Sequence, residues 1–218
     1  MFHRPIQYTN RHFSGQILYN QIDWMRLDSI IPAFQARLSE WYILPAKELA
    51  MEWHNAFSVA ALDCLLIDTL SQFRKGTLES SRSVFIGFVE DSFPQFKVNL
   101  PAIIRRKTRP PIKTLAEALY FAFRCGILHE AHIPPYCQIL PEPNIVRAEA
   151  SGIATYADAT ACCAVILDPM EMLKALEVVF ESYINNLLDP DPRHNRVRMD
   201  FKTKFEASFG INIDAARL

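Results

Sequence analysis

The sequence is poor in glycine, with six glycines among 218 residues. It holds no glycine-rich phosphate loop, no G-x-S-x-G nucleophile turn and no paired-carboxylate signature. With so few glycines, little of the backbone can approach a nucleotide closely enough to hold its phosphates. These absences argue against a nucleotide cradle built from backbone and against the hydrolases that such motifs identify.

Long apolar runs are also absent. No uninterrupted apolar stretch approaches the ~18 residues that a membrane-spanning helix needs, and residues 1–13 lack the apolar centre of a secretory signal. The five cysteines are an odd number without a framework spacing, and Cys162 and Cys163 are adjacent. We therefore expect reduced thiols in a cytoplasmic protein that has no membrane partner.

The charges of the chain nearly cancel. The formal net charge is −1, from 23 basic and 24 acidic residues, which argues against a dedicated nucleic-acid coat or a polybasic membrane tether. A local basic site remains compatible with this total. Half of the residues are hydrophobic, enough for a sizeable core in a single domain, residues 1–218.

Helical spacing dominates the N-terminal third, and we expect helices across 15–75. Pro32 is expected to break or restart the first of them, and Pro45 fits the first turn of the next. Apolar residues then recur at intervals of three and four, which predicts one long amphipathic helix over 46–75 that ends at Gly76.

A shorter helix follows, capped by Ser80 or Ser81 and ended by Pro94. After a basic, proline-bearing connector, apolar spacing predicts a further helix over 112–131. We call this element the motif helix, because it carries the motif described below.

The periodicity changes after Pro134 and Pro135, and we expect a β insertion at about 137–167. Short β-prone runs predict a hairpin that pairs about 144–149 with 152–157, and a third strand lies near 162–167. Helices over 169–208 follow, the first capped by Asp168. The predicted fold is mainly α: a helical bundle with a small β-hairpin and short-strand insertion before its penultimate helix.

The most informative stretch is "YFAFRCGILHEAHIPPYC", residues 120–137. An apolar helix ends there in Arg124, His129, Glu130 and His132. On a continuous α-helix the first two would lie about 140° apart, but a kink at Gly126 could bring them together. Since an R-x4-6-H match is expected about once by chance, an exposed arginine and a half-buried histidine are the plain alternative.

Basic residues also crowd the connector before the motif helix. They are Arg105, Arg106, Lys107 and Arg109, followed by Pro110 and Pro111. One interpretation is a solvated loop, and the other is a loop that contacts RNA phosphates together with His132.

A zinc site would use some of the same residues. Cys125, His129, His132 and Cys137 are ligand types that zinc accepts, but their spacings match no standard zinc finger. Cys125 also lies on an apolar helix. We therefore expect no metal and no cofactor.

A helical bundle with R-x4-6-H near the end of a late helix resembles the HEPN superfamily (higher eukaryotes and prokaryotes nucleotide-binding domains). The run "LYFAFRCGILHEA" is similar to the motif of many bacterial members. The resemblance covers about 46–190 in the order of elements and 120–131 in motif. It implies a homodimer in which two motifs line one cleft, RNA or a nucleotide as ligand, and an antitoxin or phage-defence protein as partner.

The resemblance leaves two functions open. Members are often metal-independent ribonucleases, which would make Arg124 and His129 the catalytic pair, with Glu130 orienting a histidine. Other members are non-catalytic scaffolds that bind RNA, nucleotides or proteins. The residue after the motif arginine is often polar in active members, and here it is Cys125, which favours the scaffold.

Overall fold

The computed structural model describes residues 11–213, which form a mainly α-helical protein with a small five-stranded mixed sheet. The predicted fold class is therefore confirmed at the level of a mainly helical chain with a small β part. The helices are α1 Leu27–Leu38, α2 Leu44–Leu49, α3 Ala56–Lys75, α4 Arg82–Ser92, α5 Leu115–Ala118, α6 Pro169–Leu188 and α7 Asn195–Phe209. The strands are β1 Asn99–Arg106, β2 Ile112–Thr114, β3 Cys137–Ile139, β4 Val146–Thr155 and β5 Ala159–Leu167.

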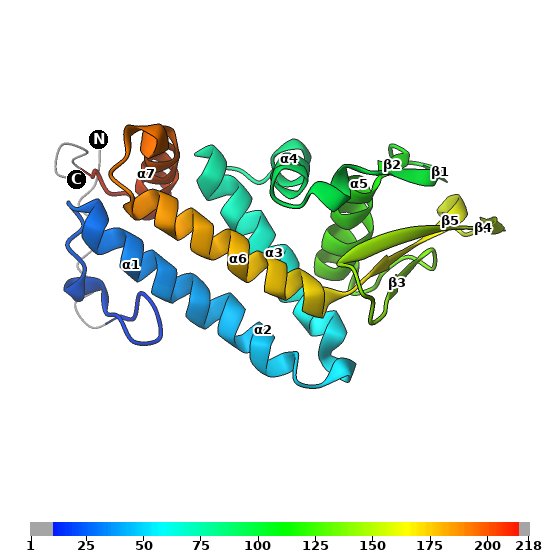
Figure 1. Ribbon diagram of the computed structural model, residues 1–218, viewed down its shortest axis with the longest axis horizontal. Coiled ribbons are helices and arrows are strands. Elements are labelled where there is room, and N and C mark those ends of the chain that lie inside the picture. Colours follow the sequence, from blue (N-terminus) through cyan, green and yellow to red (C-terminus); the bar gives the residue numbers. More distant parts are fainter. Residues whose placement is uncertain (1–10, 214–218) are drawn as a thin grey trace.

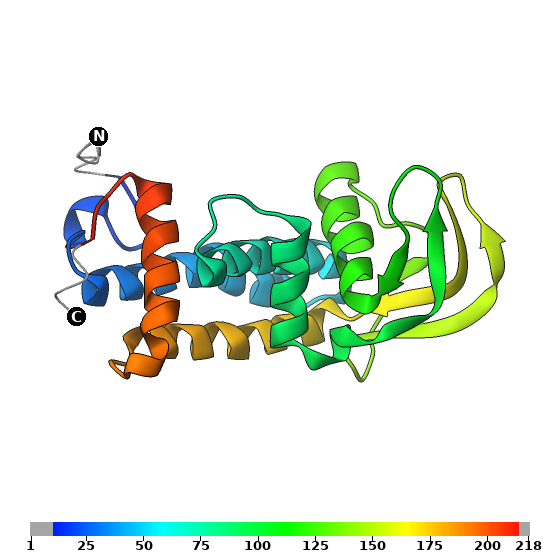
Figure 2. The same ribbon diagram turned by 90° about the horizontal axis from the view of Figure 1, so that it is seen from above.

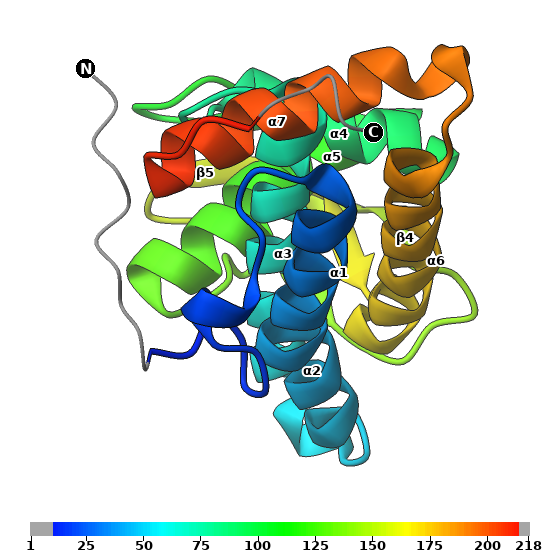
Figure 3. The same ribbon diagram turned by 90° about the vertical axis from the view of Figure 1, so that its left-hand side faces the viewer.

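Helices α1, α3 and α6 run along the long axis of the molecule, and the sheet lies at one end of them (Figure 1). Helix α7 crosses the opposite end, as the end-on view shows (Figure 3). Seen from above, α4 and the motif helix also stand across the direction of α3 (Figure 2). Most buried apolar side chains belong to one contiguous core that includes helices and sheet.

The predicted long helix over 46–75 is wrong in one respect, because it is two helices. Helix α2 ends at Leu49, a 3-10 turn occupies Trp53–Asn55, and α3 begins at Ala56. The Asn55 side-chain amide donates to the carbonyl of Leu49 at 3.1 Å, which satisfies one of the carbonyls at the end of α2. The predicted stop is confirmed, since Gly76 adopts a left-handed φ of 64° after Lys75.

Helix α1 continues through Pro32, where we expected a break. Pro32 removes one backbone donor, at a cost of about 3 kcal/mol. The residues around it bury several large side chains, including Ile30, Ile31 and Phe34, each contributing about 1.5–3 kcal/mol. Burial therefore outweighs the missing hydrogen bond. The prediction for Pro45 is confirmed, since it lies in the first turn of α2.

The sheet has the strand order β2-β1-β5-β3, and β4 also pairs with β5. Only β3 runs parallel to its neighbour β5. The predicted hairpin turn at Ser151 and Gly152 is wrong, because β4 continues through both residues and the chain turns after Thr155. Gly152 instead lies where the register shifts between Ala150 and Ala154, a usual role for a strand glycine.

The first half of the basic connector is part of the sheet, and residues 107–111 form the loop between β1 and β2. Arg105 and Arg106 end strand β1, opposite Thr160 and Ala159 of β5. Residues 112–114 form β2 instead of the first turn of the motif helix. The helix begins at Leu115, where the Thr114 hydroxyl accepts from the Glu117 backbone N–H at 3.1 Å. The apolar spacing predicts helix from residue 112 because Ile112 is apolar, but Ile112 is buried as part of a strand.

The C-terminal helices agree with the prediction. Asp168 caps α6 by accepting from the backbone N–H groups of Met170 and Glu171, at 2.9 and 3.2 Å. Helix α7 is the weaker final helix and ends before Gly210, which has a φ of 65°.

One helical segment, Trp53–Lys75, is long and apolar enough to span a bilayer by length and composition. The core helix of a globular protein passes the same test, and 56% of its most apolar window is buried inside the protein. All five cysteines lie within residues 11–213, and none forms a disulfide. Most of the stretch 1–13, examined above for a secretory signal, lies outside the described residues.

Candidate functional site

The motif helix has unusually wide turns. After α5 it continues as two π-helical segments, Leu119–Arg124 and Gly126–Glu130. A π-helical N–H bonds to the carbonyl five residues earlier, so a residue five positions on lies closer to the first around the helix than it would on an α-helix. The expected 140° separation of Arg124 and His129 assumed α-helical turns. The wide turns, rather than a break at Gly126, place both side chains on one face.

Arg124 and His129 are in direct contact. Arg124 Nη1 lies 2.7 Å from His129 Nε2. A guanidinium has donors only, so this contact is a hydrogen bond in the histidine tautomer whose Nε2 accepts and whose Nδ1 carries the proton. The histidine is exposed and Arg124 is half-buried. A basic nitrogen therefore lies at the surface beside a fixed positive charge.

Asp68 on α3 anchors the arginine. Arg124 Nη2 donates to Asp68 Oδ2 at 2.8 Å, and the Ser80 hydroxyl donates to the other carboxylate oxygen. The arginine and aspartate side chains are 14% and 13% exposed. Burial lowers the pKa of Arg124, but the hydrogen bond and charge of Asp68 outweigh it and raise the pKa overall. The guanidinium is thus charged and held from behind.

The sequence analysis did not identify Asp68. A signal was present, because a helix with an otherwise apolar stripe carries two aspartates, Asp63 and Asp68, at buried positions. Buried carboxylates on a core helix require a partner or a proton. Asp68 has a partner, whereas both carboxylate oxygens of Asp63 lack a hydrogen-bond partner among residues 11–213.

Gly126 allows the chain to fold back over the motif helix. Ala131 adopts a left-handed φ of 54°, and the His132 N–H donates to the Gly126 carbonyl at 3.2 Å. A Cβ added to Gly126 would lie 2.5 Å from the carbonyl oxygen of His132. Only glycine fits this approach without a shift of backbone. The close return brings residues of the segment 132–136 into one pocket with Phe121 and Glu130 of the motif helix.

The returning segment forms a pocket of about 350 Å³ with the end of β1. Its lining is rich in aromatic and basic side chains and comprises Arg106, Thr108, Arg109, Phe121, Gly126, Glu130, His132, Pro134, Pro135, Tyr136, Ala157 and Asp158. Four of the predicted site residues lie together here: Arg106, Arg109, Glu130 and His132. We refer to this cavity as the Arg106 pocket.

The other predicted site residues do not join the Arg106 pocket. Arg124 and His129 lie outside its lining, as do Arg105 and Lys107. Arg105 and Arg106 are successive strand residues, so their side chains leave opposite faces of β1. Lys107 is exposed, and its backbone N–H donates to the Asp158 carbonyl at 2.8 Å. The predicted site residues therefore form two separate groups, and Arg105 and Lys107 belong to neither.

Arg106 lines its pocket without an ion pair to any residue in the range 11–213. Its guanidinium lies 3.8 Å from the centre of the Phe121 ring, and Nε donates to the Pro110 carbonyl at 2.7 Å. Its Nη2 is buried without a hydrogen-bond partner in the described part of the chain. Burial is the main cause that lowers the pKa of Arg106; Tyr136 and Asp158 act to raise it, and the charges of Arg109 and Arg82 act to lower it. The buried Nη2 donor without a partner favours an anion, and Glu130 and Asp158 are the acidic residues of the same lining.

Glu130 belongs to the Arg106 pocket and not to the Arg124–His129 pair. It accepts from Arg109 Nη2 at 3.1 Å, and its carboxylate lies 3.8 Å from His132 Nε2. The backbone carbonyl of Glu130 accepts from His132 Nδ1 at 3.2 Å. No hydrogen bond or ion pair joins Glu130 to His129 within residues 11–213. The side chain is thus placed to orient His132.

The alternative zinc arrangement is not formed. Within residues 11–213, no three histidine, cysteine, aspartate or glutamate side chains are grouped so that they could hold a metal ion. Cys125, His129, His132 and Cys137 all lie in this range. Cys137 is buried in β3, whereas both histidines are exposed.

Comparison with known proteins does not assign a family. No family model matches the chain, and searches of curated proteins and of solved structures find no match either. The likeness to the HEPN superfamily accordingly depends on residues 120–131 and the order of the elements around them.

Proposed function

We propose that this chain is a HEPN-like helical bundle that cuts RNA without a metal ion. One observation carries the proposal: the 2.7 Å contact between Arg124 and His129, with the arginine anchored from behind by Asp68. Such a pair supplies the two things that the reaction needs, a proton acceptor and a fixed positive charge at the phosphate.

The chemistry is attack of a 2′-hydroxyl on the adjacent phosphorus. When a phosphate takes the Nη1 donor of Arg124, Nε2 of the neutral His129 is free to accept the 2′-hydroxyl proton. The O2′–P bond forms and the P–O5′ bond breaks, which leaves a 2′,3′-cyclic phosphate and a 5′-oxygen that must be protonated. Asp68 keeps the arginine in place because its own bonds do not involve the substrate.

The 5′-oxygen needs a second acid, and one chain offers one exposed motif histidine on this face. A two-fold symmetric dimer would bring the His129 of a second copy to the same cleft. We therefore propose a homodimer. Sedimentation at micromolar protein is expected to give twice the mass of one chain, and a strict monomer would contradict this arrangement.

The Arg106 pocket supports an RNA path beside the pair. It holds Arg106, Arg109 and His132, and the motif helix contributes Phe121, Gly126 and Glu130 to its lining. We expect these residues to bind backbone phosphates without taking part in the chemistry. Arg106→Gln should weaken RNA binding and flatten its salt dependence, while the matched changes Arg105→Gln and Lys107→Gln, outside the pocket, should have less effect.

The decisive experiment compares single alanine variants in RNA cleavage. His129→Ala should reduce the rate by about 10²–10⁴-fold, and Arg124→Ala should do similar damage. The exposed His54 lies on another element and provides the matched control, His54→Ala, with full activity expected. Products should carry a 2′,3′-cyclic phosphate and form equally in chelator. Cleavage that survives both site variants would overturn the proposal.

A non-catalytic scaffold is the second candidate. Cys125 stands where many active members have a polar residue, and the Arg124–His129–Asp68 contacts could equally serve to join the motif helix to α3. Wild-type protein that binds RNA, a nucleotide or an antitoxin-like protein but cuts no tested RNA would favour this function.

A further inference from the structure

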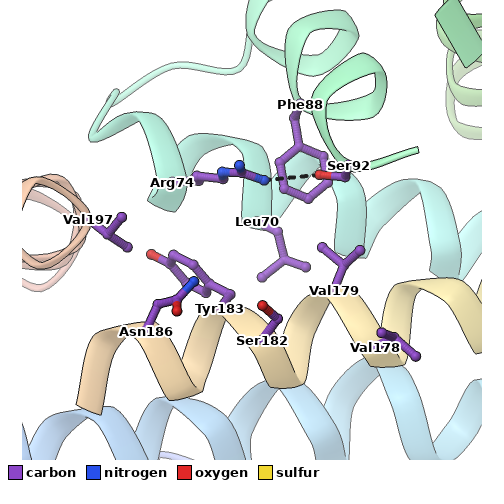
Figure 4. A pocket seen from close by; sticks show the side chains of 10 residues that line it. All are labelled: Leu70, Arg74, Phe88, Ser92, Val178, Val179, Ser182, Tyr183, Asn186 and Val197. Atoms are coloured by element: carbon purple, nitrogen blue, oxygen red, sulfur yellow. Dashed lines mark hydrogen bonds between the residues drawn. The ribbon is translucent and has the colours of Figure 1, made fainter. Parts of the chain in front are cut away.

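A second cavity lies away from both groups described above. It has a volume of about 310 Å³ and is formed by side chains of α3, α4, α6 and α7 (Figure 4). The lining residues are Leu70, Arg74, Phe88, Ser92, Val178, Val179, Ser182, Tyr183, Asn186 and Val197. We refer to it as the Tyr183 pocket. Its volume and its mixture of apolar walls with a few polar groups are typical of small-molecule sites.

Tyr183 presents a buried hydroxyl with no partner. The residue is 7% exposed, and its hydroxyl has no hydrogen-bond partner within residues 11–213. Burial raises the pKa of Tyr183, so the phenol stays neutral and can both donate and accept. Figure 4 shows Tyr183, Ser182 and Asn186 projecting from α6 toward the side of the pocket that holds Arg74. Buried hydroxyls are normally paired, so this one indicates a ligand group.

Arg74 gives the pocket its charge. It is the single charged residue of the lining, and no carboxylate contributes to the walls. Its Nη1 donates to Ser92 Oγ at 3.1 Å, and no ion pair to it forms in the described part of the chain. The nearby Asp200 is engaged by Arg196 at 2.8 Å. The pocket therefore favours a ligand with one negative charge.

The remaining walls are apolar. Leu70, Phe88 and Val179 lie on three different helices and enclose the space from opposite sides (Figure 4). A bare inorganic anion would leave these surfaces unfilled, whereas an apolar molecule without charge would leave Arg74 and the Tyr183 hydroxyl unpaired. An aryl or alkyl group attached to a carboxylate satisfies both requirements.

We propose that the Tyr183 pocket binds a small monocarboxylate with an apolar body. The carboxylate accepts from Arg74 and from the Tyr183 hydroxyl, and the body packs against Phe88 and Leu70. This site is independent of the proposed RNA cleavage, because neither Arg124 nor His129 lines it.

The test measures binding of 4-phenylbutyrate to the full chain by calorimetry, with the neutral 4-phenylbutanamide as matched ligand. We expect the acid to bind at least tenfold more tightly than the amide. Arg74→Gln should remove that difference and leave amide binding unchanged, whereas the control Arg193→Gln, which lies outside the lining and pairs with Asp191, should keep it. Equal affinities for acid and amide in the wild type, or no binding of either at millimolar ligand, would overturn the proposal.

Tyr183→Phe separates ligand binding from folding. If the hydroxyl awaits a ligand, its removal leaves the melting temperature unchanged or higher and weakens 4-phenylbutyrate binding several-fold. A lower melting temperature with unchanged binding would show that the hydroxyl serves the fold, contrary to the proposal. The His129→Ala variant should bind the acid like the wild type, so that failure here and failure of the proposed nuclease remain distinguishable.

Discussion

Arg124 on the motif helix and Arg106 on strand β1 are held in different ways. Arg124 pairs with Asp68 and contacts His129, and most of its side chain is buried. Arg106 lies over Phe121 and forms no ion pair within the described residues, and its neighbour Arg109 pairs with the exposed Glu130. Each of the two arginines has one buried donor without a partner in this range, Nε of Arg124 and Nη2 of Arg106. The first arrangement fixes an arginine in one position, as chemistry requires. The second leaves the Arg106 guanidinium without a carboxylate partner, so that it can bind an anionic ligand.

The largest effect is expected from removing the negative charge of Asp68, which holds Arg124 in place. Asp68→Asn removes the charge that balances the buried Arg124, and breaking a buried pair costs about 3 kcal/mol of unfolding free energy. The matched change Glu130→Gln touches an exposed pair and should cost less than about 1 kcal/mol. Urea unfolding of both variants measures the difference. Equal losses would mean that the two arrangements are not distinct.

Gly126 lies between Arg124 and His129 in the sequence and lines the Arg106 pocket, so it should affect both groups. A methyl group at this position meets a backbone carbonyl at 2.5 Å, so Gly126→Ala must displace the returning segment. We expect a loss of about 2 kcal/mol, together with weaker RNA binding and slower cleavage. The neighbouring change Gly152→Ala, where the added group meets nothing within 4 Å, is the control. Unchanged melting of Gly126→Ala would contradict the close return.

Asp63 provides a comparison with Asp68, because both carboxylates are buried on α3 but only Asp68 has a hydrogen-bond partner within residues 11–213. Burial raises the pKa of the unpartnered Asp63 well above its usual range. The folded state therefore holds a proton that the unfolded state releases, so the contribution of Asp63 to stability is complete below about pH 4. It is lost as the pH rises toward the folded pKa.

The corresponding measurement compares wild type with Asp63→Asn, which cannot titrate. The wild type should lose up to about 1.4 kcal/mol per pH unit relative to the variant above about pH 4. Denaturant unfolding at several pH values gives both curves. Parallel curves would show that burial does not keep Asp63 protonated in the folded protein.

The smallest effect concerns the residue that ends the motif helix. Ala131 holds a left-handed φ of 54°, which costs an alanine roughly 1 kcal/mol and a glycine little. Ala131→Gly should therefore stabilise the fold by somewhat less than about 1 kcal/mol and leave cleavage unchanged. A fall in melting temperature would mean that the turn is held by contacts of the alanine methyl group.

Local patterns in the sequence were sufficient for much of the fold. The apolar stripe and the Asp168–Pro169 start predicted α6, and Gly76 predicted the end of α3, because capping and periodicity depend on neighbouring residues alone. Local rules failed where distant contacts compete with them. Pro32 lies inside α1 because burial outweighs a lost bond, and Gly152 continues a strand because β5 pairs on both sides of it.

The sequence by itself determined which groups are candidates for the chemistry that we propose: an arginine and a histidine five residues apart at the end of an apolar helix, and basic residues just before it. Only the tertiary structure decided how they are grouped. The wide turns bring Arg124 to His129, α3 supplies Asp68 from 56 residues away, and strand β1 places Arg106 in a pocket that none of them lines. Such groupings depend on backbone geometry and on partners distant in the chain, which spacing along a sequence does not encode.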